Sequence, residues 1–511
     1  MKLKNWLALL LAVVMVFSCA ACNGKDTSSD DVDNPSSSVV DGSSDDASSD
    51  DASSDDASSD ETSSDGNLLV GSNVSGTSSG NKTSNTNGSS SNNSSSKVEI
   101  SDASSEVKVT TYQQEEKFGD IGGTTMKLFT DDITENDLLI MSEFQERYNV
   151  KMEVTNMSWS QWESSLASLV ASGNVPDVAA WTDALFLGWA YGNLAQPVNK
   201  YLDMSDPIWK KHSDIMDLYK IGNKYYGMPL DGYSNFLIYY NATLFEEQKV
   251  TDPYTLYKQG NWTFDTFLET AKKMTIKDGE TTKTYGFTTW YWQVFVLAAG
   301  SRILEPKGST YKVNLQNDAA YAGIDMIRDL YVSGSFKKSA QATDLLTRAV
   351  AMQSERPYHL IGQGEYYTQM EDELGMVPYP TVTKGAKQYA PALVTTNFIP
   401  TGAANPMAGV AYTYYSNARG IYGEETGDAG VLANRRRSLS DEHKKILDDY
   451  LENATIVTTY LEGLSGWGNS AREDLWASIM PEDPTTAISG AEAAATMESQ
   501  INSLLKLTIG G

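Results

Sequence analysis

A tryptophan and three acidic residues follow two short apolar segments in the first half of the chain. Trp181 and Asp183 come after the apolar run 178–180, and Asp131 and Asp132 come after an earlier run. A flat indole ring packs against the apolar C–H face of a sugar ring, while carboxylates accept hydrogen bonds from the hydroxyls at its edge. These residue types therefore predict the non-covalent recognition of a neutral carbohydrate.

Apolar residues around these side chains recur with the periods of strands and helices. Strand-like runs cover 126–129, 150–154 and 178–181, and the stretches between them have apolar residues at helical spacing. The helical positions are Leu138, Met141, Phe144 and Tyr148 in the first stretch and Trp162, Leu166 and Leu169 in the second. Short connections in this order predict parallel strands. Ligands bind beyond the carboxyl ends of such strands, which is where Trp181 and the aspartates stand.

A second α/β unit is predicted in the middle of the chain. The run 236–240 has the composition of a strand, and Thr263 is placed to cap an amphipathic helix. Trp262 stands before this cap and can pack on Phe267 as a hydrophobic staple, so we assign it to structure. Residues 374–380 are predicted to be extended because they contain prolines. The expected fold class is α/β, with two lobes that each contain a mostly parallel sheet flanked by helices.

Composition and charge exclude several classes of function. The chain of 511 residues has a net charge of −28, and one lysine against fourteen acids in 25–65 accounts for 1 − 14 = −13 of it. Nucleic acid is therefore not expected as a partner, because binding it needs a basic face. The only cysteines are Cys19 and Cys22, and the three histidines have no metal-ligand spacing. We expect no metal, no cofactor and no thiol chemistry.

The amino-terminal segment has the pattern of an export signal. Two lysines and an apolar run over 6–17 are followed by small residues that end at Cys22. Ala20-Ala21-Cys22 resembles the bacterial lipoprotein signal, in which the cysteine receives lipid chains such as palmitate and becomes the first mature residue. Cys19 stands where such signals usually carry leucine, so an ordinary secretory signal is the alternative. Lipidated Cys22 would hold the protein at a membrane without spanning it.

Residues 23–121 are predicted to form a disordered linker. The pentad Ser-Ser-Asp-Asp-Ala occurs three times from Ser43, and sequence rich in Ser, Asn and Gly continues to Ser96. Such a segment buries too little apolar surface to offset its chain entropy. Roughly 80 flexible residues have a root-mean-square span of about 50 Å, which would separate the folded part from a membrane. Weak binding of divalent cations by the aspartates is an alternative role.

Seven short motifs follow one another along the folded part. They are Phe-Gln-Glu-Arg-Tyr-Asn-Val at 144–150, Ala-Ser-Gly-Asn-Val-Pro-Asp-Val at 171–178, Gly-Asn-Lys-Tyr-Tyr-Gly-Met-Pro at 222–229, Tyr-Tyr-Asn-Ala-Thr-Leu-Phe at 239–245, the stretch 262–275, Arg-Ala-Val-Ala-Met at 348–352 and Met-Val-Pro-Tyr-Pro at 376–380. In this order they resemble bacterial extracellular solute-binding proteins of the group that includes maltose-binding protein. The resemblance covers nearly all of residues 122–511.

The resemblance implies two lobes that close on a ligand and deliver it to the permease subunits of an ABC transporter. The implied lobes are 122–235 with 377–417, and 236–376 with 418–511. The implied crossovers between them lie near 228–236, 375–382 and 416–420. A monomer on the extracellular face of the cell membrane is expected, with an oligosaccharide as its ligand.

The resemblance also adds candidate site residues. Trp290 and Trp292 occupy the segment of the second-lobe sugar contacts, and alternate residues of a strand share a face, so the two indoles are expected on one side. Tyr358 falls near a stacking aromatic of the family. Asp231 and Tyr233 lie in the first crossover, which faces the cleft.

Further ligand contacts are implied at sites already named. Trp181 with Asp183 matches a sugar-contacting site of the family, and the aspartates at 131 and 132 match an acidic contact. Trp467 stands between two glycines in a carboxyl-terminal loop and is another candidate platform. Each aromatic has core packing as its alternative, and Asp231 has closure of a turn.

Three other functions are compatible with these residues. A glycoside hydrolase also uses aromatics and carboxylates, but no local pattern places an acid and a base across a scissile bond, so we do not expect an enzyme. A surface sensor or adhesion module would bind glycan without feeding a transporter. A binder of a non-sugar solute, such as a peptide or a polyamine, is the third alternative.

Overall fold

The computed structural model describes most of the chain from Gln114 onward. The described residues are 96–97, 114–131, 133, 135–182, 185–230, 235–356, 370–426, 440–467, 473–475, 477 and 479–510. Outside them lie the predicted signal peptide with Cys22, nearly all of the predicted linker, and the predicted site residues Asp132, Asp183, Asp231, Tyr233 and Tyr358. What the sequence indicates for these residues stays a prediction.

The first lobe is built on a six-stranded sheet. Its order is β1 (Ser96–Lys97), β3 (Lys151–Asn156), β2 (Thr125–Thr130), β4 (Val178–Thr182), β17 (Thr395–Phe398) and β7 (Met228–Pro229). β2 pairs with β3 and β4 in parallel, which confirms the predicted direction of these strands. β17 runs antiparallel to both of its neighbours.

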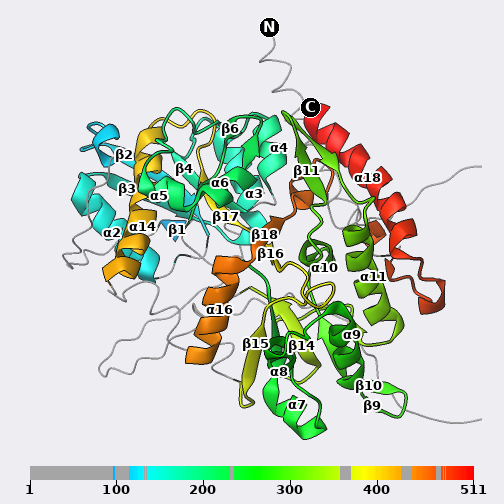
Figure 1. Ribbon diagram of the computed structural model, residues 1–511. Helices are drawn as coiled ribbons and strands as arrows, with labels where there is room; N and C mark the ends of the chain where they lie inside the picture. Colours follow the sequence, from blue (N-terminus) through cyan, green and yellow to red (C-terminus); the bar gives the residue numbers. More distant parts are fainter. Residues whose placement is uncertain are drawn as a thin grey trace, which may run out of the picture. The chain divides into compact units, whose positions relative to one another are not determined.

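Helices cover both faces of this sheet. Successive side chains of β2 point to opposite faces and therefore pack against different helices. Met126 and Leu128 pack in one buried cluster with α2 (Glu135–Tyr148) and α14 (Pro406–Thr426). Phe129 packs in the other, where its ring meets Trp162 of α3 (Trp159–Ala171) edge-on at 5.2 Å between centroids. Figure 1 shows α2 and α14 beside the strands of this lobe.

Short elements complete the first lobe. They are η2 (Glu115–Lys117), α4 (Phe186–Tyr191), α5 (Pro207–Lys211), α6 (Ser213–Leu218), β5 (Lys220–Ile221) and β6 (Lys224–Tyr225).

The folded chain begins before residue 122, where the linker was predicted to end. The backbone N–H of Gln114 donates to Asp206 Oδ2 at 2.8 Å, and Phe118 and Ile121 are buried in the first-lobe core. The predicted linker is therefore wrong at 96–97, which pair with β3, and over the segment 114–121. This segment has too few apolar residues to show a period, so only its tertiary contacts reveal it.

The second lobe contains a mixed sheet rather than the mostly parallel one that was predicted. Its order is β13 (Phe336–Lys337), β10 (Thr281–Thr288), β14 (Val350–Glu355), β8 (Leu237–Asn241) and β15 (Leu374–Val377), with β9 (Ile276–Asp278) paired to β10. β10 is parallel to β13 and β14, whereas β8 is antiparallel to β14 and β15. β8 enters from the other lobe, so local βαβ geometry does not fix its direction.

The remaining elements surround this sheet or continue to the carboxyl terminus. They are α7 (Ala242–Gln248), α8 (Pro253–Lys258), α9 (Phe264–Lys273), α10 (Val294–Ala298), β11 (Leu304–Lys307), β12 (Thr310–Val313), α11 (Asp318–Val332), β16 (Tyr389–Ala392), α16 (Asp441–Asn453), β18 (Thr455–Thr458), η4 (Leu461–Gly463), η5 (Pro484–Thr486) and α18 (Gly490–Gly510).

The start of α9 follows the sequence prediction. Thr263 is the N-cap, and its side chain and that of Thr266 form a reciprocal capping box. Trp262 is buried, and its ring meets Phe267 edge-on at 5.5 Å between centroids. The structural role of Trp262 is confirmed.

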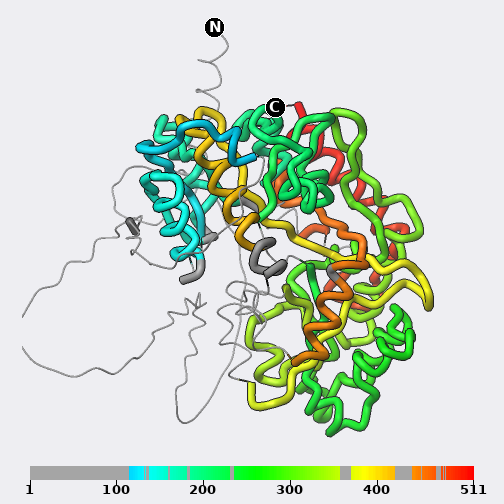
Figure 2. Tube along the Cα trace, turned by 60° about the vertical axis from the view of Figure 1, so that its left-hand side comes forward, coloured from blue at the N-terminus to red at the C-terminus, as the bar shows by residue number. Residues whose placement is uncertain are grey.

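Two segments carry the chain between the sheets. β7 belongs to the first sheet and β8 to the second, while β15 belongs to the second and β17 to the first. The two segments meet where Asn235 bridges Ala392 and the Phe236 N–H donates to the Pro391 carbonyl at 2.7 Å. Figure 2 follows the return of the chain toward the first lobe in yellow.

The predicted third crossover at 416–420 is wrong. These residues lie inside α14, which runs unbroken from Pro406 to Thr426 and packs on the first lobe. Asn417 in this helix donates to the Pro229 carbonyl at 2.7 Å, where β7 ends. The residues expected to form the third crossover therefore belong to a helix. This helix contacts the end of β7, where the first crossover begins.

The carboxyl-terminal helix contacts both lobes. α18 packs on α11 and β12, as expected for second-lobe elements, and also on α4 of the first lobe. A search of the described residues for a helix with the length and apolar composition needed to cross a bilayer found none.

Candidate functional site

The ligand edge of the first lobe is only partly described. Asp131 follows β2 directly and is half-buried. Trp181 lies in β4 with its backbone opposite Thr396 of β17, but its side chain is outside the described structure. The roles of Asp131, Trp181 and their masked neighbours Asp132 and Asp183 in ligand binding therefore stay predictions.

The loop after β10 carries the two tryptophans predicted for the second lobe. Trp290 is 42% exposed, whereas Trp292 is 1% exposed and belongs to the hydrophobic core. Their predicted placement on one side is wrong, because β10 ends at Thr288 and the strand alternation does not extend to these residues. Trp292 packs in the core, so its predicted role as a platform is not supported, and of the two only Trp290 is exposed.

Glu355 is the last residue of β14, at the carboxyl edge of the second sheet. β10 and β14 are parallel, with Thr288, the last residue of β10, opposite Gln353. The Glu355 carboxylate is buried and accepts a hydrogen bond from the Arg356 backbone N–H at 2.9 Å. Burial raises the pKa of Glu355, and the Arg356 N–H, the Arg356 charge and Trp290 partly oppose this shift.

Tyr291 connects this loop to the crossover segments. Its ring meets that of Phe236 edge-on at 5.4 Å between centroids. Phe236 begins the second lobe after the first crossover and is hydrogen-bonded to Pro391 of the returning segment. The loop with Trp290 therefore lies against the segments that join the two lobes.

Trp467 has the loop position that the sequence indicated. It follows η4, and its backbone N–H donates to the Leu464 carbonyl at 2.9 Å. Gly466 before it has a φ of 83°. Its ring is partly buried against the core. Binding of ligand by Trp467 stays a prediction.

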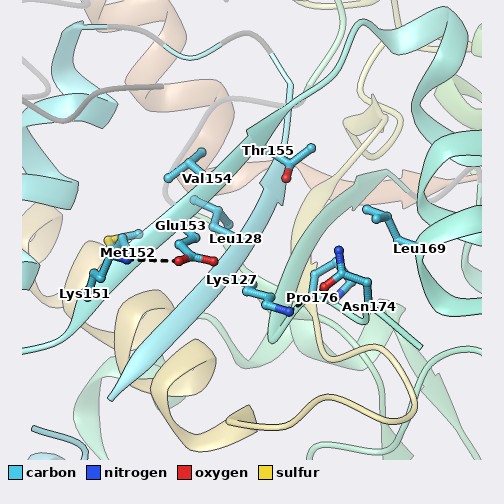
Figure 3. Close-up of a pocket in the computed structure, with 10 residues that line it drawn as sticks. All are labelled: Lys127, Leu128, Lys151, Met152, Glu153, Val154, Thr155, Leu169, Asn174 and Pro176. Atoms are coloured by element: carbon cyan, nitrogen blue, oxygen red, sulfur yellow. Dashed lines mark hydrogen bonds and ion pairs between the residues drawn. The ribbon is translucent and has the colours of Figure 1, made fainter. Parts of the chain in front are cut away.

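A separate hollow of about 240 Å³ lies on the first lobe (Figure 3). It is lined by β2, β3, the end of α3 and the loop that precedes β4. Lys127 donates to Asn174 at 2.5 Å and Lys151 pairs with Glu153 at 3.1 Å along its wall. Because this loop enters β4 at its amino end, the hollow reaches the edge opposite to the ligand edge. None of the predicted site residues lines it.

Metal chemistry has no site in the described part of the chain. Over those residues, no group of three or more His, Cys, Asp or Glu side chains is arranged to hold an ion.

Comparison with protein families identifies the chain. Residues 119–416 match the family of bacterial extracellular solute-binding proteins. The chain belongs to this family. The match covers more than half of the chain and includes the first lobe, the crossovers, most of the second lobe and the start of α14.

Solved structures share the fold of this solute-binding protein at low sequence identity. An ABC substrate-binding protein from Listeria monocytogenes in complex with cycloalternan has a TM-score of 0.57 and 14% identity, over 74% of this chain and 98% of that one. The lacto-N-biose complex of a Bifidobacterium longum binding protein has a TM-score of 0.55 and 14% identity, over 76% and 99%.

Another similar structure holds a different kind of solute. A Mycobacterium tuberculosis protein in complex with glycerophosphocholine has a TM-score of 0.55 and 13% identity, and the match covers 76% of this chain and 100% of that one. A comparison with curated protein sequences found no match. These likenesses establish the two-lobed α/β fold of type II periplasmic binding proteins for this family member.

Glu355 and Arg356 were not among the predicted site residues. Both follow the apolar run 350–352 and stand at the carboxyl end of β14. The rule that selected Asp131 and Trp181 selects the carboxyl end of this strand as well, because β14 is parallel to β10. The apolar run before these residues was therefore visible in the sequence, but using it required knowing where β14 lies in the sheet.

Proposed function

We propose that this solute-binding protein captures an oligosaccharide between its two lobes and passes it to the permease of an ABC transporter. The observation that carries the proposal is Trp290, an exposed indole ring at the carboxyl edge of the second sheet, beside the crossovers. Such a ring presents a flat apolar face to a sugar ring. Cycloalternan and lacto-N-biose, the ligands of two similar structures, are carbohydrates of this type.

Ligand capture follows from the two-lobed fold. A ligand that touches both lobes stabilises the closed form over the open one by its difference in affinity for the two. Trp290 would supply the second-lobe contact, and Trp181, Asp183, Asp131 and Asp132 the predicted first-lobe contacts. No step of this function breaks a covalent bond, so a purified oligosaccharide should be recovered unchanged.

A thermal-shift screen against malto-, xylo-, cello- and manno-oligosaccharides tests the proposal. A ligand at a hundred times its dissociation constant stabilises the folded protein by about 2.7 kcal/mol, which raises the melting temperature visibly. We expect at least one hit that is lost in Trp290→Ala. Val332→Ala removes another exposed apolar side chain, on α11, and should keep the shift. Absence of any hit, or a hit that Trp290→Ala leaves unchanged, contradicts the proposal.

The glycerophosphocholine complex of one similar structure supports a second candidate ligand class, a polar non-sugar solute. Glycerophosphocholine, short peptides and spermidine therefore belong in the same screen. A shift with one of these and none with the sugars would replace the carbohydrate.

We further propose that Cys22 is lipidated and becomes the first mature residue when residues 1–21 are removed, and that the protein is a monomer on the extracellular face of the membrane. The sequence around Cys22 and the extracellular character of the family support this placement. Mass spectrometry of the protein from membranes should find a lipid-modified Cys22, and Cys22→Ala should release the protein. Loss of growth on the bound sugar after gene deletion would support uptake, whereas unchanged growth with lost attachment would support display.

A further inference from the structure

The amide of Asn417 joins a helix of the first lobe to the start of the first crossover. Asn417 lies in α14 and is 0% exposed. Its Nδ2 donates to the Pro229 carbonyl at 2.7 Å and to the Thr413 carbonyl, one turn earlier in the same helix, at 2.8 Å. An amide nitrogen carries two hydrogens, so both bonds form at once. The side chain is therefore held between α14 and the last residue of β7.

Pro229 belongs to the ligand edge of the first sheet. It is opposite Thr396 of β17, and Thr396 is opposite Trp181 of β4. Pro229 and the predicted platform residue Trp181 thus stand in one row across three strands. From this row the chain leaves through the first crossover and enters the second sheet at β8.

The helix side of this connection is fixed to the sheet. Thr413 accepts a hydrogen bond from Asn397 of β17 at 2.9 Å and donates to the Gly409 carbonyl at 3.0 Å. At Gly409 the helix approaches the sheet closely, because a Cβ there would lie 2.8 Å from the Asp177 carbonyl oxygen. α14 also contacts α2, α5 and β4. Asn417 therefore ties the crossover to a helix that cannot shift without the sheet.

The oxygen of the Asn417 amide does not contribute to this connection. Within the described part of the chain, Oδ1 is buried and accepts no hydrogen bond. A buried acceptor without a partner costs stability, and a leucine, which has the same branched shape, would avoid this cost. What the asparagine offers here is the two donors of Nδ2, and one of them bonds to the crossover.

We propose that Asn417 is a positioning residue for ligand capture, which holds the start of the first crossover at the ligand edge of the first sheet. The proposal deepens the proposed function and rests on it for the ligand. Asn417 itself would not touch the solute. It would act through the crossover, which connects the lobes and carries the predicted site residues Asp231 and Tyr233.

Holding this connection in advance strengthens binding because less conformational freedom is lost when the ligand arrives. Asn417→Leu keeps the shape of the side chain and removes both donors, so affinity for the ligand found in the screen should fall on the order of tenfold. Asn417→Ser is the milder variant. A helical serine still donates to the carbonyl four residues earlier, so this variant loses only the bond to Pro229 and should also weaken binding.

Asn397→Leu is the matched control for loss of stability. Asn397 is 2% exposed and belongs to the same hydrogen-bond network, but its side chain bonds to Thr413 of α14 and not to the crossover. This variant should lower the melting temperature as Asn417→Leu does, and should keep the affinity within about twofold of the wild type. An equal loss of affinity in both variants would mean that Asn417 contributes only through stability, against the proposal.

Hydrogen exchange without ligand tests the positioning directly. In the full chain, mass spectrometry of peptides that cover 228–238 should show faster exchange in Asn417→Ser than in the wild type. Asn397→Leu should exchange at close to the wild-type rate over the same residues. Peptides from α2 should exchange alike in all three proteins, which separates a local effect from a general loss of stability. Exchange over 228–238 that stays at the wild-type rate in both Asn417 variants overturns the proposal.

These measurements fail separately from the ligand screen. If no solute binds, the exchange experiment still decides whether Asn417 holds the crossover, while the proposed function fails in the screen. If a solute binds with the same affinity to the wild type and to both Asn417 variants, the role of Asn417 in capture is wrong and the proposed function stands.

Discussion

A buried ion pair joins two helices of the first lobe. Glu143 of α2 and Arg419 of α14 are 6% and 7% exposed, and Arg419 Nε lies 2.5 Å from Glu143 Oε2. The Tyr415 hydroxyl donates to the same carboxylate at 3.1 Å. Burial raises the pKa of Tyr415, and the neighbouring Glu143 charge raises it further, so the phenol remains a donor. Two polar side chains thus depend on one carboxylate.

Glu143→Ala should destabilise the protein by about 3–5 kcal/mol, because it leaves the Arg419 charge buried without its partner. Glu146→Ala on the same helix is the matched control, since Glu146 is exposed, and should change stability by less than about 0.5 kcal/mol. Urea denaturation measures both. Equal losses of unfolding free energy in the two variants would show that the buried ion pair contributes no more to stability than an exposed glutamate does.

Glu355 gives a pH dependence whose sign follows from its environment. Burial raises its folded-state pKa above 4.5, so the folded protein binds this proton more tightly than the unfolded chain does. The stabilisation that protonated Glu355 contributes is complete below the pKa of this carboxyl group in the unfolded chain. It is lost as the pH rises through the pKa of the group in the folded protein. The wild type should therefore lose stability relative to Glu355→Gln from about pH 4 upward and then reach a plateau. A difference that does not vary with pH would contradict the raised pKa.

Single residues show where sequence reasoning was sufficient and where it failed. The Thr263 cap and the packing of Trp262 on Phe267 depend on residues within one turn, so the sequence predicted both. Trp290 and Trp292 needed the end of β10 to be known, because a strand that continued to Trp292 would have put them on one face. Glu355 needed a partner strand far away in the sequence.

At the scale of elements, α10 and α11 approach closely at a glycine. A Cβ on Gly323 of α11 would lie 2.4 Å from the Val296 Cα of α10. Alanine is the better helix former by about 1 kcal/mol, yet backbone on the facing helix cannot give way as a flexible side chain can. The contact between these helices therefore requires the missing side chain.

Gly323→Ala should destabilise the protein by about 1–3 kcal/mol despite the gain in helix propensity. Gly510→Ala, near the end of α18, is the control, because a Cβ there meets nothing within 4 Å. It should be neutral or slightly stabilising. Thermal unfolding of both variants tests this, and a stabilised Gly323→Ala would show that the two helices can separate at little cost.

Elements differ in how far the sequence determines them. The β2–α2–β3–α3–β4 order has short connections and a clear period, so its strands and their directions were predictable. The antiparallel direction of β8 depends on a connection from the other lobe. α14 was assigned an extended break at 416–420 by resemblance, although its own residues, buried from 408 to 415, continue as one helix.

The whole molecule combines a large negative charge with a site proposed for a neutral ligand. The net charge is −28, and the segment 25–65 holds 1 − 14 = −13 of it. A cationic solute would be attracted by this charge, and the attraction would be screened by salt. A neutral sugar held by stacking and hydrogen bonds has no such dependence.

Salt therefore separates the proposed ligand class from a polyamine. Between about 0.05 M and about 0.5 M salt, the dissociation constant of a bound oligosaccharide should change by less than about twofold, because salt screens only the interactions between charged groups. A bound polyamine should weaken on the order of tenfold or more over the same range. Calorimetric titration with the screened sugar and with spermidine measures both. A sugar whose affinity falls steeply with salt would mean that charged groups, and not the ring face of Trp290, dominate binding.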